Sequence, residues 1–226
     1  MAGLGRLGNF PRAAFQRLRP LAVGILCLGV PGFMGLAWLV MTQGHQNGLD
    51  TQATEWALQS RSPALTQALL LITNLHSVMA ISVYTVGLSV CLWVMRGHRH
   101  WLLPLWLFFP AGSALNVLLK HGFARPRPGA DEALLHLATF SFPSGHASGT
   151  TLLYGFFALV VLVHVRGPGW RWVTGVAALL VIGLVCWSRV YLGVHFLTDV
   201  LAGVVEALVW MALCVIALSA RSRPTC

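Results

Sequence analysis

Charged residues are scarce in this chain of 226 residues, forming 9% of it against 57% hydrophobic residues. A soluble domain is typically about one quarter charged, so this scarcity argues against one. The mean hydropathy of +0.74 points the same way. The composition predicts an integral membrane protein of the all-α class, because apolar runs of about 20 residues cross a bilayer as helices.

Six apolar runs have the length needed to cross a membrane, and we expect six transmembrane helices at 21–41, 69–95, 101–119, 147–165, 172–191 and 196–220. The first run lacks a small-residue cleavage site, so it is expected to be a retained helix and not a signal peptide. The chain then divides into a basic arm at 1–20, a membrane domain at 21–220 and a tail at 221–226. The arm is expected to lie on anionic lipid headgroups.

Acidic residues are rarer than basic ones: six Asp and Glu stand against 15 Lys and Arg, which gives a net charge of +9. The basic excess falls on one side of the predicted spans, where no acidic residue lies: Arg6, Arg12, Arg17, Arg19, Arg96, Arg99, Arg166, Arg171, Arg221 and Arg223. Cytoplasmic loops carry such an excess of Lys and Arg. Both termini are therefore expected in the cytoplasm, and the charge needs no nucleic acid to explain it.

Cysteine is also used sparingly, and its positions exclude a disulfide framework. Of the five cysteines, four lie inside predicted spans and Cys226 lies in the tail. No outward-facing loop can therefore form an internal disulfide. We interpret the cysteines as small core residues without a redox role.

The loop at 42–63 contains apolar residues at helical spacing, namely Leu49, Ala53, Trp56 and Ala57. We expect a short interfacial helix here, with Asp50 capping its start and Trp56 at the level of the headgroups. A plain connector is the alternative.

Polar side chains inside the spans need partners, because lipid offers none. Thr73, Asn74 and His76 lie near the outward end of the second span, where they either form interhelical hydrogen bonds or line the wall of a pocket. Glu206 lies on the same helical face as Asp199 and roughly 10 Å deeper. We interpret it as a structural residue that needs a partner or a water-filled cavity.

The stretch 188–199 places an arginine, a histidine and an aspartate where the fifth and sixth spans meet. His195 and Asp199 are four residues apart, which puts both on one face if the segment is helical. A carboxylate on one imidazole nitrogen leaves the other nitrogen able to attack or to accept a proton. Arg189 supplies a planar fork suited to phosphate. A structural ion pair at the membrane surface is the alternative interpretation.

Two further segments bring cations and a helix start to the same side of the membrane. Lys120 and Arg127 follow the third span, and Ser144, Gly145 and His146 open the fourth. The first N–H groups of a helix and its dipole favour an anion there, and Gly145 would let that anion approach the backbone closely. Together with the stretch 188–199, these groups form a site for a tetrahedral oxyanion. Attraction of the cations to lipid headgroups is the alternative.

The order and spacing of the three segments resemble the signature of the type 2 phosphatidic acid phosphatase superfamily: Lys120-x6-Arg127-Pro128, Pro143-Ser144-Gly145-His146 and Ser188-Arg189-x5-His195-x3-Asp199. The resemblance covers residues 120–199 by motif. It covers the whole chain by the six-span layout, which is similar to that of the membrane lipid phosphatases. The superfamily also includes bacterial acid phosphatases and vanadium haloperoxidases.

The resemblance implies a metal-independent phosphomonoesterase or pyrophosphatase that needs no cofactor and works through a phosphohistidine. His195 would be the nucleophile, oriented by Asp199, and His146 would be the general acid that later activates water. Fixed cations would do what Mg²⁺ does in other phosphoryl transfers. The phosphate-binding residues, which we call the cradle, would be Lys120, Arg127, Ser144, Gly145 and Arg189.

The resulting hypothesis is a lipid phosphatase of the bacterial cytoplasmic (inner) membrane, with its site on the non-cytoplasmic face and its substrate drawn from the outer leaflet. The candidate substrates are undecaprenyl pyrophosphate, phosphatidylglycerophosphate and phosphatidic acid. No obligate protein partner is expected. Two alternatives use the same cradle: a vanadate-dependent haloperoxidase, and an anion or phospholipid transporter. Transporters tend to have repeated halves and a site near the midplane, and the sequence shows neither.

Overall fold

The computed structural model describes residues 11–43, 47–129, 134–135, 139–165 and 167–220, and within them the secondary structure is helical, with no strand. The all-α prediction is confirmed for these residues. The elements are α1 (Arg12–Gln43), α2 (Gly48–Gln59), α3 (Pro63–Leu75), α4 (Val78–Val94), the 3₁₀ helix η1 (Arg96–Trp101), α5 (Leu102–Phe123), α6 (Gly145–His164), α7 (Pro168–Tyr191) and α8 (Leu197–Ala220).

Five helical segments of the described chain are long and apolar enough to cross a membrane, and they contain α1, α5, α6, α7 and α8. The predicted span at 69–95 is not one straight helix, because α3 and α4 meet at a bend of 43°. The Ser77 hydroxyl accepts a hydrogen bond from the Ala80 N–H at 3.2 Å and so starts a new helix. Counted as one broken span, the pair gives the sixth crossing.

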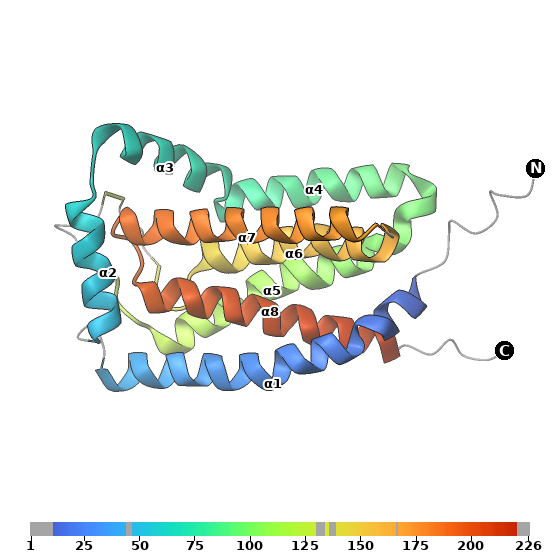
Figure 1. Ribbon diagram of the computed structural model, residues 1–226, viewed down its shortest axis with the longest axis horizontal. Coiled ribbons are helices and arrows are strands. Elements are labelled where there is room, and N and C mark those ends of the chain that lie inside the picture. Colours follow the sequence, from blue (N-terminus) through green and yellow to red (C-terminus); the bar gives the residue numbers. More distant parts are fainter. Residues whose placement is uncertain (1–10, 44–46, 130–133, 136–138, 166, 221–226) are drawn as a thin grey trace, which may run out of the picture.

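The long helices run side by side, and α2 lies across one end of them (Figure 1). The helix α1 begins and α8 ends at the opposite end of the bundle (Figure 1). Inside the bundle, α6 packs against α5, α7 and α8, and α1 packs along α8. The end of the bundle that α2 covers is called the site end below.

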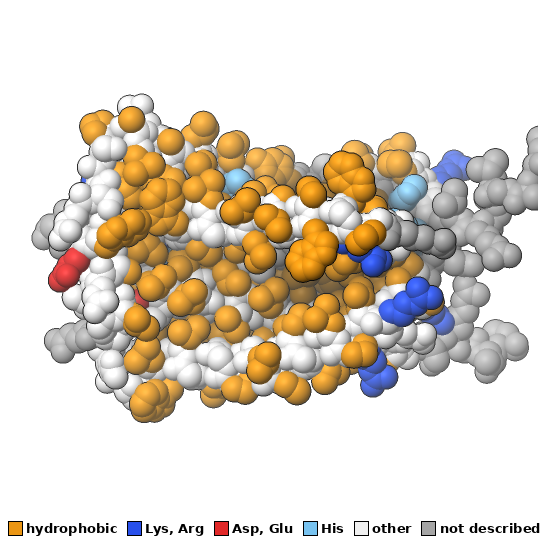
Figure 2. All heavy atoms as spheres, viewed as in Figure 1, with side chains coloured by type: hydrophobic (Ala, Val, Ile, Leu, Met, Phe, Trp, Pro, Cys, Tyr) orange, Lys and Arg blue, Asp and Glu red, His pale blue; other side chains and the backbone are white. Residues whose placement is uncertain are grey.

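The surface matches this arrangement. Hydrophobic side chains cover the length of the bundle, and basic side chains gather at the end away from α2 (Figure 2). The exposed arginines of the connections and helix starts at that end are Arg17, Arg19, Arg96, Arg99 and Arg171. An apolar belt with a basic rim at one end is the surface of a protein that spans a bilayer.

Several predicted boundaries are corrected by the structure. The helix α1 begins at Arg12, so the second half of the predicted arm at 1–20 is helical, while residues 1–10 and the tail at 221–226 lie outside the described residues. The short helix in the loop at 42–63 is confirmed as α2. Its cap is Asn47, whose side chain accepts from the Asp50 N–H at 2.9 Å, so the prediction that Asp50 caps this helix is wrong.

The end of α5 determines how the basic segment after it enters the site. Ala124 is left-handed, with a φ of 45°, and its N–H donates to the Lys120 carbonyl at 2.9 Å. A left-handed residue after the last turn ends a helix, and Pro126 disfavours helical geometry for Arg125. The chain therefore leaves the helix here and turns back across the site end.

Candidate active site

The predicted site residues come from four helix ends that meet at the site end. Lys120 lies in the last turn of α5, Ser144 caps α6, and Arg189 lies in the last turn of α7. His195 lies in the turn between α7 and α8, and Asp199 lies in the first turn of α8. Helix ends leave backbone groups without intrahelical partners, so their meeting point is naturally polar.

Asp199 holds its position through its own helix start and through a neighbouring loop. Its Oδ2 accepts from the Phe196 N–H at 2.9 Å, which is the return contact of a capping box, and from the Ser141 hydroxyl at 2.5 Å. The same oxygen lies 3.4 Å from Nδ1 of His195. The predicted contact between His195 and Asp199 is therefore present, although His195 precedes the helix.

The second nitrogen of His195 faces the cradle. Its Nε2 lies 3.2 Å from Nη1 of Arg127, which can only donate, so this contact assigns the lone pair to Nε2 and the proton to Nδ1. Burial lowers the pKa of His195 to about 3, although the hydrogen bond and the charge of Asp199 raise it. A neutral imidazole with its lone pair directed at cationic donors is the form that a nucleophile needs.

Arg189 has unused donors. Its side chain is 1% exposed, and Nη1 donates to the Thr73 hydroxyl on α3. Its Nε and Nη2 have no hydrogen-bond partner among the described residues. A buried guanidinium with two open N–H directions can hold a phosphate through its planar fork.

Lys120 and Arg127 are oriented by backbone carbonyls. The Lys120 ammonium donates to the carbonyls of Phe140 at 2.7 Å and Ser141 at 3.4 Å. Arg127 donates from Nε to the Thr139 carbonyl at 2.7 Å and from Nη1 to the Val194 carbonyl at 2.6 Å. Neutral carbonyls fix the two side chains without cancelling their charge, so both cations stay available to an anion.

The start of α6 is open toward the same place. Ser144 is fully buried and forms the N-cap by backbone geometry, yet its hydroxyl makes no capping bond and has no partner among the described residues. Its N–H donates to the Asp199 carbonyl at 2.9 Å. A Cβ on Gly145 would lie 3.7 Å from Cε of Lys120, so the helix start is adjacent to that cation. The hydroxyl is thus left for a ligand.

His146 completes the group electrostatically. Its ring lies within range of the charges of Lys120, Arg127 and Arg189 and of His195. It is partly exposed, unlike His195. The structure therefore brings together every residue that the sequence proposed for the site.

Gly203 allows α8 to approach this helix start. A Cβ there would lie 2.5 Å from the Ser144 carbonyl oxygen, closer than van der Waals contact permits. The glycine is needed for close contact of the two backbones, and that contact sets Ser144 beside Asp199. The sequence offers no periodic signal for it.

The polar groups of the broken span differ in role. Thr73 contacts Arg189 of the site, as the pocket interpretation expects. His76 instead lies 3.0 Å from the hydroxyl of Tyr154 on α6, as the interhelical interpretation expects. Glu206 is 4% exposed and accepts from Asn116 of α5 at 2.9 Å, so it has the predicted partner.

Sequence reasoning missed two residues of this region. Arg125 donates to Asp199 at 2.6 Å and to Asp50 at 2.8 Å, and all three side chains are buried. The sequence did contain one signal for this contact. Lys120, Arg125 and Arg127 lie close together on the side of the membrane that also carries the acidic residues, and such a cluster of cations needs an anionic partner. Nothing in the spacing indicated that α2 would supply it. The acidic residues Asp131 and Glu132 and the nearby His136 lie outside the described residues.

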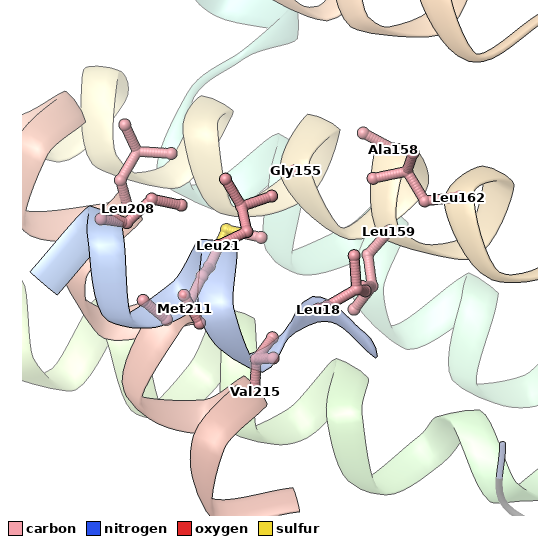
Figure 3. Close-up of a pocket in the computed structure, with 12 residues that line it drawn as sticks. Leu18, Leu21, Gly155, Ala158, Leu159, Leu162, Leu208, Met211 and Val215 are labelled. Atoms are coloured by element: carbon pink, nitrogen blue, oxygen red, sulfur yellow. The ribbon is translucent and has the colours of Figure 1, made fainter. Parts of the chain in front are cut away.

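One hollow away from the site end is apolar. A cavity of about 120 Å³ lies between α1, α6 and α8 near the end away from α2, and it is lined by apolar side chains and a glycine (Figure 3). Within the described part of the chain, no group of three or more His, Cys, Asp and Glu could hold a metal ion. The candidate phosphate-binding residues are at the site end.

Comparison with known proteins provides independent evidence about the family of this chain. Residues 101–223 match the model of the PAP2 superfamily. Phosphatidylglycerophosphatase B of Bacillus subtilis is 34% identical over 174 residues, which are 76% of this chain and 83% of that protein. Undecaprenyl-diphosphatase of Sulfolobus acidocaldarius is 41% identical over 64 residues, 28% of this chain and 27% of that protein.

Solved structures resemble the fold. The transmembrane PAP2 type phosphatidylglycerolphosphate phosphatase from Bacillus subtilis superposes with a TM-score of 0.75 at 28% identity, covering 90% of this chain and 98% of that one. LpxE of Aquifex aeolicus gives a TM-score of 0.61 at 21% identity, covering 77% of this chain and 98% of that one. The second likeness concerns the fold alone.

Proposed function

This chain belongs to the PAP2 superfamily as a membrane-embedded phosphoric ester hydrolase of the lipid phosphatase branch, and from that premise we propose that it removes phosphate from a lipid headgroup through a phosphohistidine at His195. One observation carries the proposal. Two nitrogens of the buried Arg189 and the hydroxyl of Ser144 have no partner among the described residues. Burying polar groups without partners is costly, so such groups indicate a ligand of matching chemistry.

The first chemical step forms a bond between Nε2 of His195 and phosphorus while the bond from phosphorus to the lipid oxygen breaks. His146 acts as the general acid and gives a proton to the departing oxygen. Asp199 stabilises the positive charge that develops on the imidazole, because its carboxylate lies beside Nδ1. The cradle neutralises the equatorial oxygens of phosphorus as they develop charge.

The second step releases phosphate. Water gives a proton to the now neutral His146 and attacks phosphorus from the side that the lipid has left. The bond from phosphorus to Nε2 breaks, and His195 returns to its neutral form. The cradle residues supply the positive charge for both steps, and on this basis we propose that no metal ion is required.

We propose that phosphatidylglycerophosphate is the first substrate to test. Phosphatidylglycerophosphatase B matches this chain over 174 residues, whereas two relatives named as undecaprenyl-diphosphatases match it over 123 and 64 residues. Undecaprenyl pyrophosphate is the second candidate and phosphatidic acid the third. By the positive-inside rule, the arginine-rich end and both termini would be cytoplasmic, and the site would face the outer leaflet of a bacterial inner membrane.

The test is phosphate release by purified protein from these three lipids in the presence of EDTA. The wild type is expected to hydrolyse at least one of them, and His195→Ala is expected to release none above background. His98→Ala, in η1 at the far end of the bundle, is the matched control and should keep wild-type activity. A need for added metal, or activity that survives in His195→Ala, would contradict the mechanism. Absence of hydrolysis by the wild type would favour binding or transport of an anionic lipid.

A further inference from the structure

The helix α2 contributes a carboxylate to the polar end of the bundle. Asp50 is fully buried. Its Oδ1 accepts from the Thr198 N–H at 2.8 Å, and its Oδ2 accepts from the Thr198 hydroxyl at 2.7 Å. Asp50 thereby caps the first turn of α8 from another element, which is a stronger tie than its predicted role in α2. This carboxylate lies outside the residues that match the PAP2 model.

Arg125 connects this carboxylate to Asp199. Its Nη2 donates to Oδ2 of Asp50 at 2.8 Å, and its Nη1 donates to Oδ1 of Asp199 at 2.6 Å. The guanidinium also lies over the ring of Phe196, with 4.2 Å to the ring centroid. Arg125 therefore contacts both Asp199 and the residue that follows His195.

The two oxygens of Asp199 have different partners as a result. Oδ1 is held by Arg125, and Oδ2 is the oxygen near Nδ1 of His195. The Phe196 N–H and the Ser141 hydroxyl hold Oδ2 itself, and Arg125 fixes the other oxygen, so the orientation of the whole carboxylate depends in part on Arg125. The direction of Arg125 depends in turn on Asp50, the second carboxylate that it bridges.

We propose that Asp50 is a positioning residue of the hydrolase, acting through Arg125 and Asp199 to hold His195 in its attacking orientation. The inference rests on the proposed phosphohistidine function. It adds a long-range requirement: the helix that lies across the bundle must be in place for the nucleophile to be aligned. The Asp50 carboxylate accepts hydrogen bonds from Asn47, Arg125 and Thr198, none of which belongs to the cradle, so phosphate binding and nucleophile alignment should respond separately to its loss.

The experiment measures kcat and inhibition by inorganic phosphate for Asp50→Asn, which keeps the size of the side chain and removes its charge. We expect kcat to fall by about tenfold to a hundredfold, by analogy with the loss of a residue that orients a metal-binding histidine or carboxylate. The inhibition constant for inorganic phosphate should change less than about twofold, because the cradle holds the anion. Glu55→Gln, an exposed carboxylate on the same helix, is the matched control and should behave as wild type.

A double-mutant cycle separates positioning from general support. If Asp50 acts through Asp199, Asp50→Asn should have little further effect in an Asp199→Asn background, because residues of one network are not additive. A full additional loss in that background would overturn the proposal, as would a wild-type kcat in Asp50→Asn. A parallel rise in the phosphate inhibition constant would assign Asp50 to the cradle and also overturn it.

Two further measurements keep these outcomes distinct. Thermal unfolding in detergent shows whether Asp50→Asn is folded, and Asp50→Glu, which retains the charge, should recover part of kcat if alignment is the cause. If Asp50→Asn does not fold, Asp50→Glu and Arg125→Lys are measured in its place. A kcat equal to that of the wild type in both of these variants would contradict the proposal. An inactive wild type would count against the proposed function, whereas an active wild type with fully active Asp50→Asn counts against this inference alone.

Discussion

Two buried arginines at the site end of the bundle have opposite surroundings. Arg125 bridges Asp50 and Asp199 behind the histidine, with its guanidinium against the ring of Phe196. Arg189, on the cradle side, has no salt bridge among the described residues, and two of its nitrogens lack partners there. A cation with carboxylate partners fixes the positions of those neighbours, whereas a buried cation without a carboxylate partner can bind an anionic ligand. The site therefore has two regions. The paired region consists of Asp50, Arg125 and Asp199, and the open region contains Arg189 and Ser144, which have donors without partners in the described part of the chain.

The largest effect on stability is expected when the ion pairs of the paired region are removed. Arg125→Met would leave Asp50 and Asp199 buried without their cation, and removing one partner of a buried ion pair costs about 3–5 kcal/mol. Thermal unfolding of the protein in detergent should show this loss as a clearly lower midpoint.

The reference variant is Arg96→Met, which changes an exposed arginine at the start of η1. Such surface changes usually stay within about 0.5 kcal/mol. If Arg125→Met unfolded at the temperature of this reference, the network between α2 and α8 would not contribute to stability in the way its geometry indicates.

A substitution in the open region should lower the activity and leave the stability nearly unchanged. Arg189→Lys keeps a positive charge but loses the planar fork, so kcat/KM should fall by about 10²–10³, as for loss of a donor to developing charge. The unfolding midpoint should stay near that of the wild type, because no carboxylate loses its partner. Inorganic phosphate should raise the midpoint of the wild type more than that of the variant.

Arg61→Lys serves as the control, because Arg61 donates to the Tyr191 carbonyl near the end of α7 and is not part of the cradle. It should keep kcat/KM within about twofold, as expected of a contact outside the transition state. If Arg189→Lys lowered the midpoint as much as Arg125→Met does, the distinction between the two regions would fail.

The same distinction explains what the sequence could predict. The open region contains Arg189, which belongs to the spaced stretch that also carries His195, and Ser144, which stands at a helix start. Each is tied to a local element, so apolar periodicity and helix-start chemistry were enough to place them. Their meeting then followed from the topology of the spans, because all three segments end on one side.

The paired region could not be predicted in the same way. Asp50 and Arg125 are far apart in the chain, and their contact depends on how α2 lies across the bundle (Figure 1). Local chemistry suggested a helix cap for Asp50, and a tertiary partner overrode that preference. The break between α3 and α4 was missed for a related reason. Polar residues such as His76 and Ser77 also occur inside unbroken spans, and only the capping geometry of Ser77 reveals the bend.

A finer contrast lies in two serines that both stand at helix starts. The Ser77 hydroxyl accepts from the Ala80 N–H and so serves its own helix, whereas the Ser144 hydroxyl has no partner among the described residues. Ser77→Ala should cost about 1 kcal/mol of stability, the usual value of a lost cap, and leave kcat/KM nearly unchanged.

Ser144→Ala should show the reverse. No capping bond is lost, so the unfolding midpoint should stay at or slightly above that of the wild type. The substrate phosphate would lose one donor, and a hydrogen bond to a charged group contributes about 1.5–3 kcal/mol, so kcat/KM should fall by about tenfold or more. The unfolding midpoint and kcat/KM should both be measured for Ser77→Ala and for Ser144→Ala. A loss of stability in Ser144→Ala with unchanged kcat/KM would mean that this hydroxyl supports the helix and not the phosphate.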